Sequence, residues 1–308
     1  MQKHGAVVRV GARVMQIVYH IGANCTDGDR LLRALLRNAD ALRGEGVCIP
    51  GPGKYRKVLR EAILGLIDPP GGGVVAPGTR EALLDQITDG QDTRRLVMSN
   101  STFLCLPARV FEDGVFYGRA GAKVATLPLL FPGDGIELFL GLRNPATFIP
   151  AVWRQSELGW GEFMGGLDPR AVRWSEVVAR IRAAVPEARL TVWCNEDTTL
   201  IWGTLLRRIA GVAADRTMAG DYDLLASVMA PEGMQRFLSY METHPGQTDL
   251  QVRRVIGAFL DKFAIPEAIE EEVDAPGWDA AMVAAITRAY EADVDRIAAM
   301  PGVEFIAA

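Results

Sequence analysis

Short apolar runs alternate with longer amphipathic segments along this chain. The short runs are typical of buried strands, and they cover residues 14–21, 47–49, 95–99, 136–142 and 189–194. In the longer segments apolar residues recur every three or four positions, which predicts helices. These helices are expected at 29–44, 55–67, 79–88, 144–156, 171–184, 198–211, 222–241, 248–263 and 278–299. The alternation predicts one α/β domain over residues 1–308, with a mostly parallel sheet, helices on both faces and a helical C-terminal layer.

The composition indicates the class of protein but not its function. The chain has 308 residues, of which 49% are hydrophobic and 23% charged, as expected for a soluble globular protein. Its net charge of −5 gives no general attraction for nucleic acid. Charged residues or glycines interrupt every apolar stretch, so we expect no insertion into a membrane. Four widely spaced cysteines predict reduced thiols and a cytoplasmic protein.

The segment IVYHIGANCTDGDRLLRALL, residues 17–36, has the order strand, glycine-containing loop and helix. This order directs backbone N–H groups and the positive end of a helix toward one point, which is how many folds bind phosphate. Such a loop normally adds a lysine and a hydroxyl group. Here the loop reads Cys25, Thr26, Asp27, Gly28 and Asp29.

Several segments resemble a bacterial member of the sulfotransferase family, which has a P-loop-type fold. The similar stretches are residues 17–50, LFLGLRNPATFIPAVWRQ (138–155), WSEVVARIRAAVPEARLTVWCNED (174–197) and ITRAYEADVDRIAAMPGVEFI (286–306). The resemblance implies transfer of a sulfonate group from phosphoadenosine phosphosulfate to a hydroxyl or amine of a small-molecule or carbohydrate acceptor. It also implies a set of residues near the donor, namely Cys25, Thr26, Gly28, Asp29 and Arg30 around the loop, and Arg143 on the 3′-phosphate.

The donor loop departs from the family pattern. Cys25 stands where the family has its lysine, Asp27 where it has glycine, and Gly28 and Asp29 where it has two threonines. A phosphate about 5 Å from one aspartate feels roughly 3 kcal/mol of repulsion at an effective dielectric near 20. Ala151 also replaces a serine near the 3′-phosphate. We therefore expect a weak or inactive relative that is retained to bind a small molecule or a protein partner, with an active sulfotransferase as the alternative.

Two other interpretations of the aspartates remain open. Asp27 or Asp29 could cap the following helix, since aspartate accepts N–H bonds there and complements the helix dipole. Alternatively, Asp27-Gly28-Asp29 could be the D-x-D metal site of a nucleotide-sugar transferase.

The residues that could supply acid–base chemistry are few. Glu196 follows a predicted strand and is the best candidate for a general base, although an ion pair with Arg207 would also explain it. His20 lies at the end of the first strand and is expected to be a buried polar group whose hydrogen bonds are satisfied. Lys54, Arg56 and Lys57 are expected on a solvated helical face, with the lining of an anion pocket as the alternative.

Two further clusters have ordinary structural explanations. Trp153, Trp160, Phe163 and Trp174 are expected to pack in the core, with a glycine-flanked lid as the alternative. The acidic run over residues 267–274 is expected to be a solvated helix end.

Overall fold

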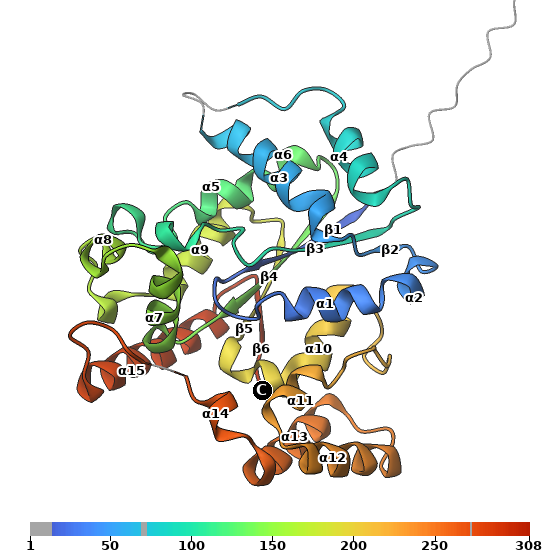
Figure 1. Ribbon diagram of the computed structural model, residues 1–308. Coiled ribbons are helices and arrows are strands. Elements are labelled where there is room, and N and C mark those ends of the chain that lie inside the picture. Colours follow the sequence, from blue (N-terminus) through green and yellow to red (C-terminus); the bar gives the residue numbers. More distant parts are fainter. Residues whose placement is uncertain (1–13, 69–72, 272) are drawn as a thin grey trace, which may run out of the picture.

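The computed structural model describes residues 14–68, 73–271 and 273–308, and its centre is a six-stranded parallel sheet (Figure 1). The strand order is β2-β3-β1-β4-β5-β6. The strands are β1 (Gln16–Gly22), β2 (Val47–Cys48), β3 (Arg95–Ser99), β4 (Gly135–Leu142), β5 (Arg189–Cys194) and β6 (Val303–Ile306). The predicted α/β fold is confirmed, and five of these strands lie where the apolar runs placed them.

Strand β1 lies between β3 and β4, and both of its faces are buried. Its side chains alternate between two hydrophobic clusters: Ile17 and Tyr19 point into one, and Val18 points into the other. Val18 is in register with Val97 of β3 on one side. Because helices cover both faces, the strand reads as a continuous apolar run rather than as an alternating pattern.

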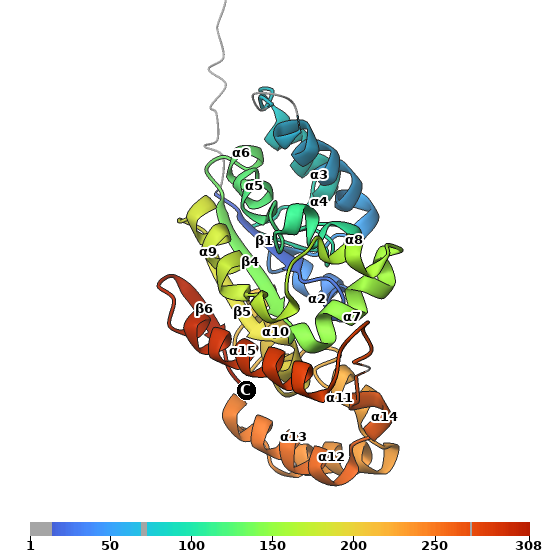
Figure 2. The same ribbon diagram turned by 90° about the vertical axis from the view of Figure 1, so that its left-hand side faces the viewer.

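Helices cover both faces of the sheet, as Figures 1 and 2 show. The face with Val18 packs against α1 (Arg30–Arg37), α2 (Ala39–Arg43) and α10 (Thr198–Ala210). The opposite face packs against α3 (Pro52–Ile67), α4 (Thr79–Thr88), α5 (Ala120–Ala125), α6 (Leu127–Leu130), α7 (Pro145–Ser156), α8 (Trp160–Met164), α9 (Trp174–Ala184) and α15 (Ala280–Ala298).

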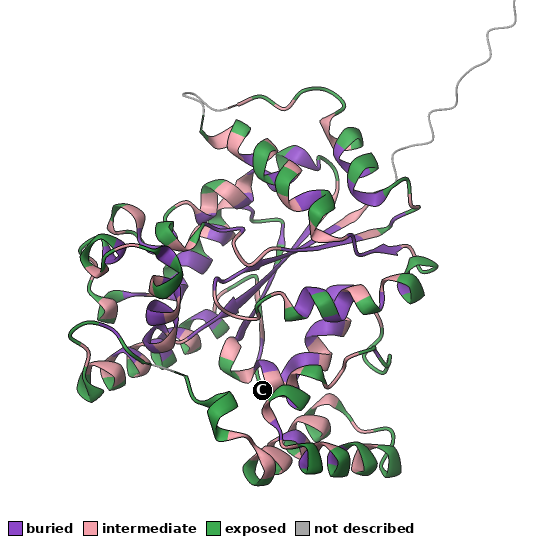
Figure 3. Ribbon diagram, viewed as in Figure 1, coloured by how far each residue is buried: buried purple, intermediate pink, exposed green. Residues whose placement is uncertain are grey.

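A helical layer follows α10, as predicted. It consists of α11 (Asp223–Val228), α12 (Pro231–Thr243), α13 (Asp249–Phe263) and α14 (Pro266–Ile269). Its own core is small, with four buried residues, Leu225, Met229, Phe237 and Ile256. Figure 3 shows that much of α12 and α13 is exposed. In the part of the chain that the structure describes, no helix is both long and apolar enough to cross a membrane.

The structure corrects several element boundaries. The helix expected at 29–44 is divided at Asn38, and the one expected at 222–241 is divided before Pro231, which begins α12. A proline is favoured at the first position of a helix because its missing N–H has no partner there in any case. The sequence also gave no indication of β6, which pairs with β5 in parallel.

The aromatic cluster packs in the core rather than forming a separate lid. Phe163 and Trp174 are buried in the larger hydrophobic cluster, while Trp153 and Trp160 pack against it. The Trp153 and Trp160 rings lie edge to face, with their centroids 5.2 Å apart. The core-packing expectation is confirmed.

Chain connections leave the two central strands in opposite directions. After β1 the chain crosses through α1 toward β2 and β3, whereas after β4 it crosses through α7 and α9 toward β5. In open α/β sheets such a reversal creates a crevice at the carboxyl ends of the strands, where ligands bind. The topology therefore directs attention to the loops after β1, β4 and β5.

Candidate functional site

A pocket of about 440 Å³ lies at the carboxyl ends of β1, β4 and β5. The loop after β1 contributes Thr26 and Asp27, the segment after β4 contributes Thr147, and the segment after β5 contributes Glu196. Asn195 lies next to Glu196 in the segment after β5, and the remaining lining residues come from α1, α10, α11 and the α14 region: Arg30, Thr198, Thr199, Trp202, Leu224, Val228, Ala268, Ile269 and Glu271. The topological crevice is thus a pocket with mixed polar and apolar walls.

Asp27 caps the first helix from inside the loop. Its Oδ2 accepts a hydrogen bond of 2.9 Å from the backbone N–H of Leu31, in the first turn of α1. The capping interpretation is confirmed for Asp27. The carboxylate uses an N–H group of the kind that holds a phosphate in other folds, and it carries the same sign of charge.

Asp29 faces a different partner. Its backbone is left-handed, with φ 61°, and its side chain does not cap the helix. Instead its carboxylate accepts two hydrogen bonds from Arg56, from Nη1 at 2.9 Å and from Nη2 at 2.6 Å. These hydrogen bonds lower the pKa of Asp29 below its usual range.

Arg56 was expected on a solvated face, and that expectation is wrong. Its side chain is only 28% exposed, and it also donates to the carbonyl of Ser99 at the end of β3. The guanidinium group therefore links α3, the end of β3 and the loop after β1. It neutralises one of the two aspartates that separate this loop from a phosphate loop.

Arg143 lies at the end of β4, where the sulfotransferase resemblance placed it, and it is 9% exposed. Three groups hold its guanidinium. Nη1 donates to the carbonyl of Cys25, Nε donates to Thr147 Oγ1 at 3.2 Å, and Nη2 forms an ion pair with Glu271 Oε1 at 2.9 Å. An anionic side chain of this protein thus pairs with the arginine for which the resemblance predicts a phosphate contact.

Glu271 was part of the acidic run expected to be solvated. Its side chain is 38% exposed, so the solvated position is confirmed, and it also forms an ion pair with Arg143. Residue 272 of the same run lies outside the described residues. The loop after α14 therefore brings a carboxylate to the pocket wall, which no local pattern in the sequence indicated.

Glu196 is held by two donors at the pocket wall. Its Oε1 accepts from the backbone N–H of Asn144 at 2.7 Å, and its Oε2 accepts from Tyr290 Oη at 3.1 Å. Burial raises the pKa of Glu196, and the Asn144 N–H opposes this shift. The expected ion pair with Arg207 is wrong, because Arg207 pairs with two other carboxylates. A carboxylic acid at a pocket wall with a raised pKa suits a proton donor or acceptor.

The other loop residues have structural partners. Thr26 Oγ1 donates to the carbonyl of Ala23 at 2.8 Å, and Gly28 is exposed with φ 56°. Cys25 is half-buried, and burial raises the pKa of its thiol, so it is a poor nucleophile. All four cysteines are free thiols, as predicted.

His20 is buried, as expected, but it is not fully satisfied, because its Nε2 has no hydrogen-bond partner. Its Nδ1 shares a hydrogen bond of 2.8 Å with Ser99 Oγ. Burial lowers the pKa of His20, while the charge of Asp27 acts in the opposite direction. His20 is not among the residues that line the pocket.

The structure brings together three of the six residues predicted for a donor site, Thr26, Arg30 and Arg143, with the predicted general base Glu196, whereas Cys25, Gly28 and Asp29 do not line the pocket. Thr26, Arg30 and Glu196 line the same pocket, and Arg143 lies beside it through Thr147. The electrostatics differ from those of a phosphate site. Three carboxylates line the pocket, from Asp27, Glu196 and Glu271, against the single guanidinium of Arg30.

The arrangement does not favour a D-x-D metal site either. Asp27 faces the start of α1, whereas both oxygens of Asp29 face Arg56. Among the described residues, no group of three or more metal-ligating side chains comes together.

No family model, curated protein or solved structure matches this chain. The resemblance to sulfotransferases therefore depends on the sequence motifs alone and stays a prediction.

Proposed function

We propose that this protein is a sulfotransferase-like binding protein that does not transfer sulfonate. In this proposal the pocket at the ends of β1, β4 and β5 holds a small, hydroxyl-rich molecule of the carbohydrate class. The observation that carries the proposal is that the protein's own carboxylates occupy both predicted phosphate positions: Asp27 at the start of α1 and Glu271 on Arg143.

The charge of the pocket supports a neutral or cationic ligand. A phosphoadenosine phosphosulfate molecule would bring several negative charges to a wall with three carboxylates. Each carboxylate about 5 Å from a phosphate costs roughly 3 kcal/mol at an effective dielectric near 20, before screening by solvent. The lysine that would offset this repulsion is absent, because Cys25 stands in its position.

The polar groups of the pocket suit hydroxyl ligands. Carboxylates accept hydrogen bonds from hydroxyl groups, and the pocket also offers the hydroxyls of Thr26, Thr147 and Thr199. Trp202 and Ile269 provide apolar surface for the nonpolar face of a sugar ring. A volume of about 440 Å³ is in the range of small-molecule sites. The free thiols support a cytoplasmic location.

Ligand-observed NMR and calorimetry test this proposal. Adenosine 3′,5′-bisphosphate should show no binding in the micromolar range, and a panel of glucose, glucosamine and N-acetylglucosamine should include a binder that Thr199→Val weakens. Asp40→Asn, on the exposed side of α2, is the matched control for a change away from the pocket. Micromolar binding of the bisphosphate by the unaltered protein would contradict the proposal, and so would the absence of any saccharide binding.

An active sulfotransferase is the second candidate, and one observation favours it. Arg30, Arg143 and Thr26 lie near the carboxyl ends of β1 and β4. The ion pair between Glu271 and Arg143 is partly exposed. A partly exposed ion pair is worth about 0.2–1 kcal/mol, so a phosphate could displace it. Transfer of radiolabelled sulfonate from phosphoadenosine phosphosulfate to a saccharide acceptor would support this candidate instead.

A further inference from the structure

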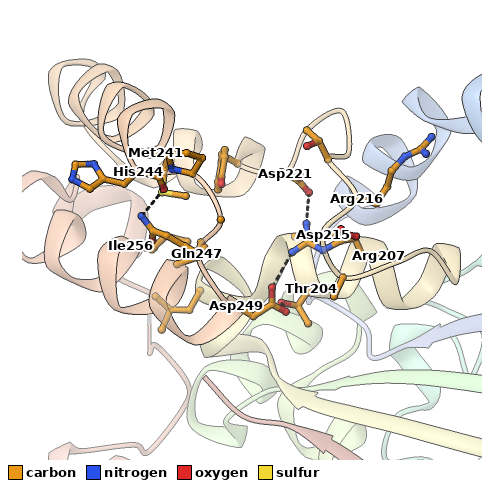
Figure 4. Close-up of a pocket in the computed structure, with 18 of the residues that line it drawn as sticks. Thr204, Arg207, Asp215, Arg216, Asp221, Met241, His244, Gln247, Asp249 and Ile256 are labelled. Atoms are coloured by element: carbon orange, nitrogen blue, oxygen red, sulfur yellow. Dashed lines mark hydrogen bonds and ion pairs between the residues drawn. The ribbon is translucent and has the colours of Figure 1, made fainter.

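A second cavity, of about 250 Å³, lies between α10 and the helices α12 and α13. One wall is polar and carries Arg207, Asp221, Asp249 and Thr204, which Figure 4 shows on the side of α10. The facing wall is largely apolar and includes Met241, Val252 and Ile256. Ligand sites commonly combine apolar surface with a few placed polar groups, and this cavity offers both to a small amphiphilic molecule.

The guanidinium of Arg207 is held between two elements. Its Nη1 donates to Asp221 Oδ1 at 3.1 Å, and its Nη2 donates to Asp249 Oδ1 at 3.4 Å (Figure 4). Thr204 Oγ1 donates to the other oxygen of Asp249 at 2.8 Å. Two carboxylates therefore already neutralise Arg207, and they leave an excess of negative charge.

Other lining residues do not cancel this excess. Asp215 adds a third carboxylate and is exposed. Arg216 also lines the cavity, but it forms an ion pair of 3.2 Å with Glu45 outside it. The lining groups thus present more carboxylate than unpaired guanidinium charge. Such a surface attracts a cation and repels an anion.

An acceptor in the facing wall lacks a partner. Gln247 Nε2 donates to the carbonyl of His244 at 3.1 Å, whereas Gln247 Oε1 is buried without a hydrogen bond. On the polar wall the Nε of Arg207 is likewise buried without a partner, so each wall keeps one polar atom unpaired, which costs free energy.

We infer that this cavity binds a small primary amine with an apolar chain. The ammonium group contacts the carboxylates of Asp215 and Asp221, and the chain packs against Met241 and Val252. The inference is independent of the function proposed for the pocket at β1, because it depends on different residues.

Three probes of similar size separate charge from shape. They are 3-methylbutylamine, the neutral 3-methylbutan-1-ol and the zwitterion leucine, each titrated against the full-length protein with calorimetry and saturation-transfer NMR. The amine should bind saturably, and the alcohol and leucine should each bind at least about tenfold more weakly. No saturable binding of the amine, or equal binding of the three, would overturn the inference.

Variants then assign the binding to this cavity. Asp221→Asn and Asp215→Asn should each weaken amine binding at least about threefold by removing a carboxylate, and Val252→Phe should abolish it by filling the cavity. Asp261→Asn, on the exposed side of α13, is the matched control and should leave affinity unchanged. Circular dichroism verifies that each variant is folded, and Asp215→Asn keeps the test valid if Asp221→Asn does not fold. Unchanged affinity in Val252→Phe would overturn the inference.

Discussion

Removing the two carboxylates at the predicted phosphate positions should convert the pocket at β1 into an anion site. The perturbation is the double variant Asp27→Asn, Glu271→Gln. Both substitutions keep the side-chain size, and asparagine at position 27 still offers an oxygen to the N–H of Leu31. Asparagine is therefore a better choice than glycine, which would leave α1 without this cap.

The magnitude follows from charge and exposure. A carboxylate about 5 Å from a phosphate repels it by roughly 3 kcal/mol at an effective dielectric near 20, an upper value. Glu271 is 38% exposed, so solvent screening reduces its share to about 1 kcal/mol. With a contribution of about 1–2 kcal/mol from Asp27, the variant should bind adenosine 3′,5′-bisphosphate roughly 30- to 150-fold more tightly.

Isothermal titration calorimetry at low and moderate salt measures this change. The gain should shrink at higher salt, because salt screens exposed charges. Glu267→Gln lies on α14 and removes one charge close to Glu271 in the chain, so it is the matched control and should change affinity little. Equal affinity of the double variant and this control would contradict an electrostatic role for the two carboxylates.

Three further predictions concern stability. Asp29→Ala should lower the free energy of unfolding by about 2–3 kcal/mol, because it removes two charge-assisted bonds to Arg56 and places alanine at φ 61°. The pKa of Asp29 is lowered in the folded state, so its ionised form stabilises the fold. This stabilisation is present above the unfolded pKa near 3.9 and is lost as the pH falls through the folded pKa. Urea titrations at pH 7 and pH 3 can detect the difference. Trp174→Phe should cost about 1–3 kcal/mol in thermal unfolding, because a fully buried ring shrinks and the bond from its indole N–H to the Arg143 carbonyl is lost; no change would contradict the burial. Glu196→Gln should lose no stability at pH 7. The pKa of Glu196 is raised in the folded state, so its ionised form destabilises the fold as the pH rises above the unfolded pKa near 4.3. A loss above about 1 kcal/mol in urea unfolding would refute this.

The strands and most helices could be predicted because their signal is local. Val18 and its neighbours form an apolar run that is typical of a buried strand, and the helical spacing of the leucines in α1 indicates the face that holds the buried Leu31, Leu32 and Leu35. Strand β6 escaped prediction because four residues after a long helix carry little pattern. Its place in the sheet comes from pairing with β5, which is a tertiary contact.

The site was predictable to the extent that its contacts are local. The bond from Leu31 to Asp27 spans four residues, and the preference of aspartate for helix starts indicated it. The partners of Asp29 and Arg143 lie far along the chain, at Arg56 and Glu271. Sequence patterns give the charge of such residues but not their distance, so neither ion pair could be foreseen.

The small core of the C-terminal helical layer has a consequence for how the molecule opens. With four buried apolar residues, α11 to α13 are stabilised by much less buried apolar surface than the sheet is. Local openings should therefore reach these helices at a lower free energy than global unfolding requires. Backbone amide protons of α12 and α13 should exchange with deuterium before those of β1 and β4, and trypsin should cleave first after the arginines of this layer.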